Sequence, residues 1–369
     1  MEQDGNEYNK IGPEKIIKIY DPATGMKSIV CIDSTARGPA KGGVRMRPDV
    51  TEEEIFRLAR AMSLKCAMAD LPFGGGKAGI IADDKTLSTK QKKSLVISFA
   101  KAIKNLAPSE YVSAPDMNMA EEEMRIIVKE IGNKKAVTGK PKNLGGIPHE
   151  IGSTGFGLFH ATKVALKHLK MDIKNVTFAV EGFGNVGEFV AKFMTEAGAT
   201  LIAVSDSRGV IYNPKGLDFE KLRKVKHKEG MVTKYPDGKV KESNQILDLK
   251  ADILITAAVK DLIKHADISR LKFKLIVEGS NIPMTHETED ELHKKGILVL
   301  PDYVVNAGGV ISSYVEYKGG TVKEMWKMVE QKITKNTSHL LKEMGKRKCC
   351  ARTVANDIAA KRICPECTV

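Results

Sequence analysis

Residues 176–187 read VTFAVEGFGNVG, and this stretch decides the fold. Its first five residues are apolar or β-branched and predict a strand. The three glycines follow that strand and lead into a predicted helix, which is the context that a dinucleotide-binding turn requires. In such a turn the first glycine makes the bend, the second lets backbone N–H groups approach a pyrophosphate, and the third lets the helix pack closely on the strand. The stretch therefore predicts a nicotinamide dinucleotide site.

The rest of the chain supports two domains of the α/β class. After the glycine turn, strands predicted at 200–204, 253–256 and 275–278 alternate with helices, as in a doubly wound, Rossmann-type parallel sheet. The N-terminal half is also α/β, with strands expected at 27–33 and 78–82. The expected organisation is a substrate-binding and oligomerisation domain at 1–145, a dinucleotide-binding domain at 146–310, and C-terminal helices at 311–369 that pack back on the first domain.

Helices of the first half are predicted from apolar periodicity and caps. Thr51-x-x-Glu54 is a capping box that opens one helix, and two more are expected at 88–106 and 120–131. Ser153 is the expected N-cap of a helix that runs to about Leu169.

The residues after the second strand leave the choice of dinucleotide open. Asp206 stands 19 residues beyond Gly187 (206 − 187), where an acidic side chain binds the ribose of NAD. Its neighbours Ser205, Ser207 and Arg208 could equally receive the 2′-phosphate of NADP. The cofactor is therefore expected to be NAD or NADP.

The amino-acid composition limits the kinds of partner that the protein is expected to bind. The 369 residues carry a formal charge of +13, which would suit either nucleic acid or a small anion. Lys and Arg are interleaved with Asp and Glu along most helices rather than concentrated, so we expect no nucleic-acid partner. The lysine-rich stretch 215–242 is expected to be a solvated insertion rather than a site. No apolar run approaches the roughly 20 residues that span a bilayer, and the first residues have no apolar signal core. We expect a cytoplasmic protein without a membrane partner.

The six cysteines do not form a recognisable framework. Cys31 and Cys66 lie inside predicted elements, and all six cysteines are expected as thiols. Cys349, Cys350, Cys364 and Cys367 have a spacing that is not typical of zinc sites, so we predict no metal.

Three lysines in the first half indicate an anionic substrate. Lys41 stands among glycines in GPAKGGVR, Lys65 lies near the apolar face of a predicted helix, and Lys77 follows three glycines. Glycines let backbone approach a ligand closely, and ammonium groups that converge would bind carboxylates and lower the pKa of one another.

These residues belong to a set of motifs that resembles the family of glutamate, leucine, phenylalanine and valine dehydrogenases over nearly the whole chain. The motifs are Gly38-Pro39-x-Lys41-Gly42-Gly43-x-Arg45, Met62-x-x-Lys65, Leu71-Pro72-x-Gly74-Gly75-Gly76-Lys77, Ala114-Pro115-Asp116-Met117-Asn118, Thr138-Gly139-Lys140-Pro141, GFGNVG, Glu278-Gly279-x-Asn281 and Asn306-Ala307-Gly308-Gly309-Val310. The resemblance implies a reversible oxidative deamination of an L-amino acid by a hexamer of identical subunits.

The resemblance also implies roles. Lys77 would be the general base, Asp116 would exchange protons with the substrate nitrogen, and Lys65 would hold the α-carboxylate. The other residues expected to bind substrate are Lys41, Gly42, Gly43, Gly74, Gly75, Asn306 and Ser313. The residues expected to bind the cofactor are Thr154, Gly182, Phe183, Gly184, Asn185, Val186, Gly187, Asp206, Ser207, Ala257, Asn281 and Asn306. Hydride would pass across a cleft between the two domains.

Two positions indicate the substrate side chain. The family places a side-chain carboxylate against residues that correspond here to Lys41 and Ser313, and an unpaired ammonium in an apolar pocket would cost several kcal/mol. L-Glutamate is therefore expected, with a branched-chain amino acid as the alternative. The stretch Gly145 to Glu150 departs from the glutamate-type pattern after Thr138-Gly139-Lys140-Pro141, and the N-terminus is short, as in the leucine type.

Overall fold

Two structural units make up residues 9–366, the part of the chain that the computed structural model describes. The first unit contains the chain up to His149, Val310–Met325 and the chain from Asn356 onward. The second contains Glu150–Gly309 and Trp326–Ala355. The expected C-terminal segment 311–369 is thus divided between the two units.

The first unit is built on a five-stranded mixed sheet in the order β1-β2-β4-β3-β5. The strands are β1 (Lys15–Asp21), β2 (Met26–Ser34), β3 (Ala40–Arg47), β4 (Gly74–Ile81) and β5 (Tyr111–Pro115). β2 is antiparallel to β1 and β4, whereas β3 is parallel to both β4 and β5. Parallel pairing brings the carboxyl ends of β3, β4 and β5 to one edge of the sheet.

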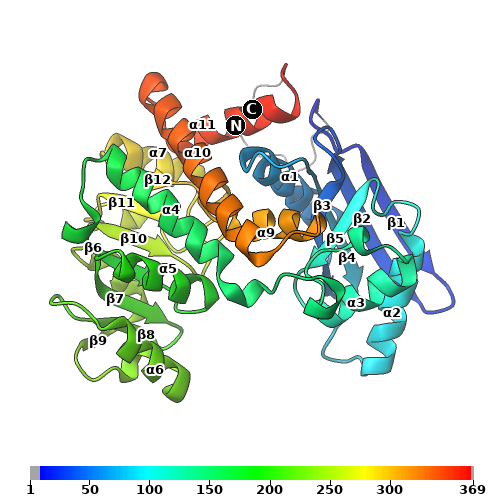
Figure 1. The fold of residues 1–369 in the computed structure, drawn as a ribbon, viewed down its shortest axis with the longest axis horizontal. Coiled ribbons are helices and arrows are strands. Elements are labelled where there is room, and N and C mark those ends of the chain that lie inside the picture. Colours follow the sequence, from blue (N-terminus) through cyan, green and yellow to red (C-terminus); the bar gives the residue numbers. More distant parts are fainter. Residues whose placement is uncertain (1–8, 367–369) are drawn as a thin grey trace. The chain divides into compact units, whose positions relative to one another are not determined.

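Helices cover both faces of this sheet (Figure 1). They are α1 (Glu52–Met68), α2 (Thr89–Ala102) and α3 (Glu121–Ile131). Successive residues of β2 point to opposite faces, so Ile29 and Cys31 pack with α1 while Val30 and Ile32 join the core made with α2 and α3. Burial on both faces makes β2 apolar at nearly every position.

The sequence predicts β2 and the later part of β4 but not β1, β3 or β5. The β3 segment contains Gly42 and Gly43, and β4 starts with three glycines, which lowers the strand propensity. Pairing with buried neighbours on both sides overrides that propensity. At the next unit, the helix expected to be capped by Ser153 has Gly152 as its N-cap and Ser153 as its first residue.

The second unit contains a seven-stranded sheet in the order β12-β11-β10-β6-β7-β8-β9. The strands are β6 (Thr177–Glu181), β7 (Thr200–Asp206), β8 (Gly209–Tyr212), β9 (Lys239–Lys241), β10 (Ile253–Thr256), β11 (Leu275–Glu278) and β12 (Leu298–Leu300). Five strands from β12 to β7 are parallel, and the chain leaves β6 toward β7 on one side and reaches β10 on the other. The expected doubly wound sheet is confirmed, with its topological switch point between β6 and β10.

One edge of this sheet differs from a purely parallel arrangement. β8 returns antiparallel to β7 through a tight turn after Asp206, and β9 adds a second antiparallel strand. The lysine-rich stretch 215–242, expected to be a solvated insertion, contributes α6 (Phe219–Glu229) and β9 to the second unit.

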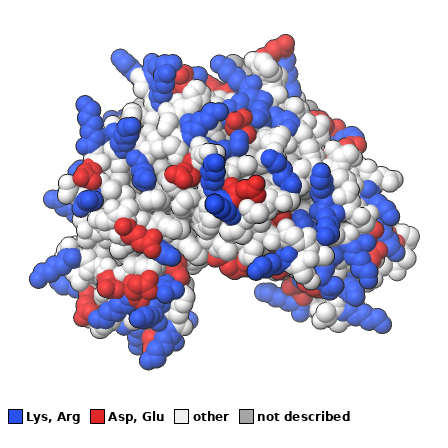
Figure 2. Space-filling view, viewed as in Figure 1, with Lys and Arg blue, Asp and Glu red and all other residues white. Residues whose placement is uncertain are grey.

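Further helices complete both units. They are α4 (Ser153–His168), α5 (Asn185–Glu196), α7 (His286–Lys294), α8 (Asp302–Val305), α9 (Gly308–Tyr317), α10 (Val322–Arg347) and α11 (Ala351–Ile363). α4 and α5 pack against each other beside the parallel strands (Figure 1). Among the described residues, no helix combines the length and the apolarity that a membrane span needs. Figure 2 shows Lys and Arg side chains interspersed with Asp and Glu over the visible face.

Candidate active site

An ion pair forms across β3, between the middle of β4 and the end of β5. Lys77 on β4 forms it with Asp116, which follows β5 directly. The Nε of Arg45 on β3 donates to the same carboxylate oxygen over 3.0 Å. The three strands therefore bring one charged side chain each to a single cluster.

The protonation of this cluster is set by burial and mutual charge. Burial lowers the pKa of the Lys77 ammonium; Asp116 opposes this effect only in part, and Arg45 adds to the lowering. Burial alone would raise the pKa of Asp116, but the charges and hydrogen bonds of Lys77 and Arg45 outweigh it and lower that pKa. The sequence predicts the lowered pKa of Lys77 from cationic neighbours, whereas its main cause is burial.

Only one of the two hydrogen bonds of the capping box predicted at the start of α1 is formed, because its glutamate binds Arg45 of this cluster instead. The Thr51 hydroxyl accepts a hydrogen bond from the backbone N–H of Glu54 as expected. The Glu54 carboxylate, however, accepts from Arg45 over 2.6 Å instead of folding back on the helix start. Arg45 is thus fixed between Glu54 and Asp116, and it orients Asp116 toward Lys77.

Glycines allow the strands around this cluster to approach closely. A Cβ on Gly43 would lie 2.8 Å from the Cβ of Asp116 and 3.3 Å from the Nζ of Lys77. Cβ atoms on Gly42, Gly74 and Gly75 would meet backbone atoms at 1.7, 1.7 and 2.1 Å, respectively. These four positions, predicted to bind substrate, are therefore also needed as glycine by the packing of the unit.

Lys65, the third lysine of the prediction, is half-buried on α1. It stands two residues beyond Ser63, whose backbone nitrogen a Cβ on Gly75 of β4 would meet at 2.1 Å. The segment of α1 that carries Lys65 therefore packs beside the glycine run that precedes Lys77.

Lys41 is a fully buried ammonium with one hydrogen-bond acceptor. It is 2% exposed, and its Nζ donates to the backbone carbonyl of Ser113 over 3.2 Å. Burial lowers its pKa to about 7; Cys66 and Glu316 counteract that shift, and Lys140 and Lys77 reinforce it. An ammonium so buried is stable in its charged form only when an anion compensates it.

A segment from α9 brings Ser313 to the same unit. Ser313 is buried on α9, and Glu316 stands three residues later on the same helical face. Phe73, which precedes the three glycines, packs edge-on against Tyr314 and Tyr317 with ring centroids 5.5 and 5.0 Å apart. Ser313 is therefore held by a helix that packs directly on the segment leading to Lys77.

Glu316, which sequence reasoning missed, anchors the segment that departs from the glutamate-type pattern. Its carboxylate accepts from the Nζ of Lys140 over 2.6 Å and from the backbone N–H of Ile147 over 3.0 Å. All of these groups are buried. Glu316 is thus already satisfied by Lys140 and does not neutralise Lys41.

In the second unit, the three glycines of the turn differ in what surrounds them. Gly182 has φ of +92°, and a Cβ there would meet Ala258 at 2.5 Å. A Cβ on Gly187 would lie 1.9 Å from the carbonyl oxygen of Gly182, whereas a Cβ on Gly184 would meet nothing within 4 Å. Gly184 is the N-cap of α5 and offers no side chain to its first N–H groups. The helix start is therefore open to an anion, which is what a pyrophosphate requires.

The other residues of the turn contribute to the unit itself. The Phe183 ring is buried with its centroid 6.3 Å from that of Phe219, and Val186 is half-buried. The side-chain amide of Asn185 donates to the carbonyl of Glu150.

Asp206, the predicted ribose ligand, is already engaged. One carboxylate oxygen accepts from Lys226 over 2.7 Å and from the N–H of Val232 over 2.8 Å, and the other accepts from the N–H of Arg208. Burial alone would raise its pKa, but Lys226 and these N–H groups lower it. Ser207 beside it is exposed. Lys226 lies in the stretch predicted to be a solvated insertion, so this contact could not be expected.

Loops at the carboxyl ends of the parallel strands complete the region. Glu181, at the end of β6, accepts hydrogen bonds from the backbone N–H groups of Ala257, Ala258 and Val259. Thr154, near the start of α4, lies against the two glycines that follow Asn306; a Cβ on Gly309 would lie 3.3 Å from its hydroxyl oxygen.

Asn281 and Asn306 are joined side chain to side chain. The amide nitrogen of Asn306 donates to the Oδ1 of Asn281 over 3.1 Å and to the carbonyl of Gly279 over 3.2 Å. The Oδ1 of Asn306 is buried and has no hydrogen-bond partner. A buried acceptor without a partner is costly, so this atom fits a ligand that donates a hydrogen bond.

A buried cation holds the loop that carries Asn281. Arg352 on α11 contacts the carboxylates of Glu278, Glu289 and Asp302, and Asp302 accepts in turn from the backbone N–H of Ile282. Burial raises the pKa of Glu278 well above its usual range, and the neighbouring Glu289 raises it further. Sequence reasoning missed this cluster because its members come from four separate segments.

The cysteines partly follow expectation. Cys31, Cys66 and Cys350 are thiols, as expected. Cys364 is disulfide-bonded, which corrects the expectation of thiols throughout. Cys367 lies outside the described residues.

A doubly wound sheet with an open glycine turn, joined in one chain to a unit that buries lysines beside an aspartate, defines an amino-acid dehydrogenase. The chain belongs to the Glutamate/Leucine/Phenylalanine/Valine dehydrogenase family, which matches residues 145–367, and the dimerisation domain of that family matches residues 13–133. The resemblance seen in the motifs is thereby confirmed.

Relatives carry the name glutamate dehydrogenase. The chain is 41% identical over 321 residues to the glutamate dehydrogenase of Aeropyrum pernix. The aligned residues cover 84% of this chain and 77% of that protein. It is 37% identical over 346 residues to the NADP-specific glutamate dehydrogenase of Saccharolobus shibatae, covering 89% and 82%, respectively. Its fold matches the leucine-bound hetero-hexameric glutamate dehydrogenase of Thermus thermophilus with a TM-score of 0.82 at 27% identity, over 95% of this chain and 88% of that one.

Proposed function

We propose that the protein catalyses the reversible NAD(P)-dependent oxidative deamination of L-glutamate to 2-oxoglutarate and ammonia. The observation that carries this proposal is the buried ammonium of Lys41, whose Nζ donates to a backbone carbonyl rather than to a carboxylate. The nearby carboxylate of Glu316 is taken by Lys140. A substrate with a second carboxylate supplies the missing anion, with the Ser313 hydroxyl as an additional donor.

Lys77 and Asp116 perform the proton transfers in this proposal. Because its pKa is lowered, Lys77 can be neutral and accept a proton from the substrate or from attacking water. Asp116 remains ionised beside it and exchanges protons with the substrate nitrogen. Lys65 holds the α-carboxylate, and the backbone at Gly42, Gly43, Gly74 and Gly75 lines the substrate.

The second unit fits a nicotinamide dinucleotide. Gly184 leaves the start of α5 open for the pyrophosphate, and the unpartnered Oδ1 of Asn306 suits the amide N–H of a nicotinamide carboxamide. The residues proposed to bind the cofactor are Thr154, Gly182, Phe183, Gly184, Asn185, Val186, Gly187, Asp206, Ser207, Ala257, Asn281 and Asn306. The cofactor supplies the hydride acceptor, and the protein supplies orientation.

Lys226 bears on the choice between NAD and NADP. An isolated aspartate at position 206 would repel the 2′-phosphate of NADP, but Lys226 neutralises this one over 2.7 Å. We therefore expect NADP to be accepted along with NAD.

The test is a matrix of L-amino acids against NAD and NADP, read by absorbance of the reduced cofactor. Glutamate is expected to give the highest kcat/KM, and Lys41→Leu to lower it by at least about 100-fold, since a buried carboxylate would lose its partner. The second candidate is a branched-chain substrate, since Gly145 to Glu150 departs from the glutamate-type pattern. If leucine or valine exceeded glutamate and Lys41→Leu changed little, that candidate would replace the first.

The protein is further proposed to act as a homohexamer. The match to a family dimerisation domain and the likeness to a hetero-hexameric structure support this assembly.

A further inference from the structure

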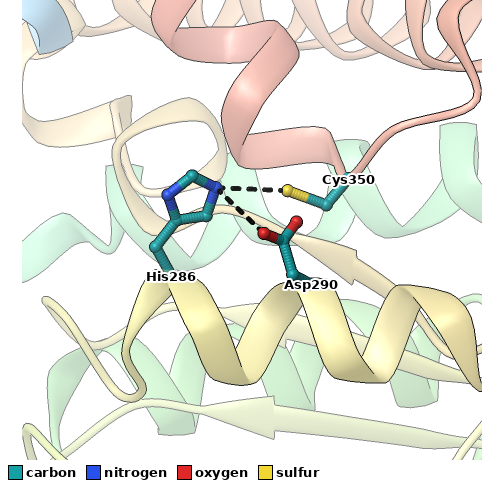
Figure 3. A group of neighbouring side chains, drawn as sticks. All are labelled: His286, Asp290 and Cys350. Carbon is teal, nitrogen blue, oxygen red and sulfur yellow. Dashed lines mark hydrogen bonds and ion pairs between the residues drawn. The ribbon is translucent and has the colours of Figure 1, made fainter. Parts of the chain in front are cut away.

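Three side chains with different ligand atoms converge away from the proposed substrate and cofactor residues. His286 and Asp290 lie on α7, and Cys350 directly precedes α11. Figure 3 shows the imidazole and the carboxylate both pointing from α7 toward the sulfur. One ligand atom from each residue lies within 4.8 Å of the other two.

The placement of these atoms follows from the two elements that carry them. His286 and Asp290 are four residues apart, so one face of α7 presents both. Cys350 stands at the N-terminus of α11, where Arg352 two residues later binds three carboxylates, including Glu289 of α7. That ion cluster holds the start of α11 against α7 and so fixes the sulfur above His286.

The distances suit a small tetrahedral ion. Zinc bonds of about 2.0–2.3 Å to N, O and S place neighbouring ligand atoms roughly 3.3–3.6 Å apart. The Sγ of Cys350 lies 3.4 Å from the Nε2 of His286, and the Oδ2 of Asp290 lies 4.0 Å from the same nitrogen. To bind the same ion as the imidazole, the carboxylate would have to move a few tenths of an ångström closer to that nitrogen.

A fourth oxygen lies within the same group. The hydroxyl of Thr353 is 3.0 Å from the Nε2 of His286 and 3.2 Å from the Sγ of Cys350. This hydroxyl, or a water in its place, would complete four-coordination.

The group is accessible to an ion although its sulfur is buried. Cys350 is 2% exposed. A thiol that coordinates a metal is deprotonated outright, so the bound sulfur would be a thiolate. The side chains of His286 and Asp290 are 38% and 46% exposed, so an ion can reach the group from solvent.

We propose that His286, Asp290 and Cys350 form a zinc-binding site that joins α7 to the start of α11. The mixture of imidazole, carboxylate and thiolate suits Zn²⁺ and, as a spectroscopic substitute, Co²⁺, whereas Mg²⁺ and Ca²⁺ prefer oxygen ligands alone. Binding releases the thiol proton to solvent and leaves the redox state of the sulfur unchanged. The role of the ion is structural, because it fastens the helix start that carries Arg352.

The test measures metal binding to the full chain after removal of metal, without cofactor and without a thiol reductant, so that the disulfide of Cys364 stays closed. Zinc is titrated in competition with a chromogenic chelator, and Co²⁺ is added separately to record absorption. The expected result is one zinc per chain and a sulfur-to-cobalt charge-transfer band in the near ultraviolet. Cys350→Ser should abolish that band, and His286→Ala should weaken zinc binding by at least about 100-fold.

Two matched variants separate this site from other ligands. His293→Ala removes a second histidine of α7, and Cys349→Ser removes the neighbouring thiol; both should bind zinc as the unaltered chain does. Zinc should raise the Tm of the unaltered chain and of these two variants, but it should not raise the Tm of His286→Ala. Absence of the charge-transfer band in the unaltered chain, equal zinc affinity of His286→Ala, or loss of binding in Cys349→Ser would each overturn the proposal.

Discussion

At the residue scale, the pairing of Lys77 with Asp116 makes a prediction with a defined sign. Asp116 raises the pKa of Lys77, so Asp116→Asn should lower that pKa further. If Lys77 must be neutral to act as base, the acidic limb of the kcat profile for deamination should move to lower pH. The plateau should fall by about 10²–10⁴-fold because proton exchange with the nitrogen is lost.

The measurement is kcat from about pH 6 to about pH 10 under saturating substrate. Asp84→Asn serves as control, since it removes a carboxylate of the same unit that is paired with Lys92 instead. An acidic limb that stays in place or moves to higher pH in Asp116→Asn would show that Lys77 is not the titrating base.

The buried charge of Lys41 leads to a second prediction. The ammonium that is proposed to bind the substrate should also lower the stability of the folded protein. Its pKa falls from the ordinary 10.5 to about 7 in the folded protein, so the unfolded chain takes up the proton first as the pH falls. The buried charge therefore reduces the free energy of unfolding. This reduction is absent above about pH 10.5, grows as the pH falls, and reaches its full size below about pH 7. Lys41→Met should therefore raise the free energy of unfolding by about 2 kcal/mol at pH 6.

Urea unfolding of both proteins at about pH 6 and about pH 10 checks this prediction. The gain from Lys41→Met should shrink at the higher pH, where the unfolded lysine is itself partly neutral. A gain that is equal at both values, or a loss at the lower one, would contradict the burial of an uncompensated charge.

Sequence reasoning reached Lys41, Lys77 and Asp116 because each stands in a motif with distinctive glycine or proline neighbours. It did not reach Glu316 or Lys226, since nothing in their local sequence marks them as buried partners. Their roles depend on contacts over 176 and 20 residues along the chain, respectively. The zinc ligands are separated in the same way, by 64 residues between His286 and Cys350.

At the element scale, the glycine turn predicts different outcomes for two substitutions. Gly184→Ala adds a Cβ that meets no protein atom, so Tm should stay within about 2 °C while KM for the dinucleotide rises by at least about 10-fold. Gly187→Ala places a Cβ 1.9 Å from a carbonyl oxygen and should lower Tm by about 4 °C or more. Thermal unfolding and cofactor titrations distinguish the two; an equal loss of Tm in both would contradict an open site at Gly184.

The strands also show how far the local sequence pattern predicts secondary structure. Strands β6, β7, β10 and β11 were predictable because buried parallel strands are continuous apolar runs bounded by turns. β3 was not, because its glycines are dictated by neighbours such as Gly76 and Asp116 rather than by strand propensity. The antiparallel β8 follows from the tight turn after Asp206, and a parallel sheet gives no reason to expect it.

At the scale of the whole molecule, a formal charge of +13 does not produce a separate basic surface on the face shown in Figure 2. Much of the lysine and arginine is committed to ion pairs, including Lys77, Lys140, Lys226 and Arg352, which hold loops or side chains of the proposed site. These basic side chains therefore arrange carboxylates and loops within each unit.

Assembly makes the last prediction. β1 is an edge strand of the first sheet and lies within residues 13–133, which match the family dimerisation domain. An edge strand exposes unpaired N–H and C=O groups, and Tyr20 on β1 is 61% exposed, as expected for a surface that another subunit covers. Tyr20→Glu should therefore lower the mass measured by light scattering from that of six chains of 40.4 kDa to that of a smaller assembly.

Val240→Glu is the matched control, because Val240 is 60% exposed on the edge strand β9 outside that domain. A mass unchanged in Tyr20→Glu, or reduced equally in Val240→Glu, would remove β1 from the subunit interface.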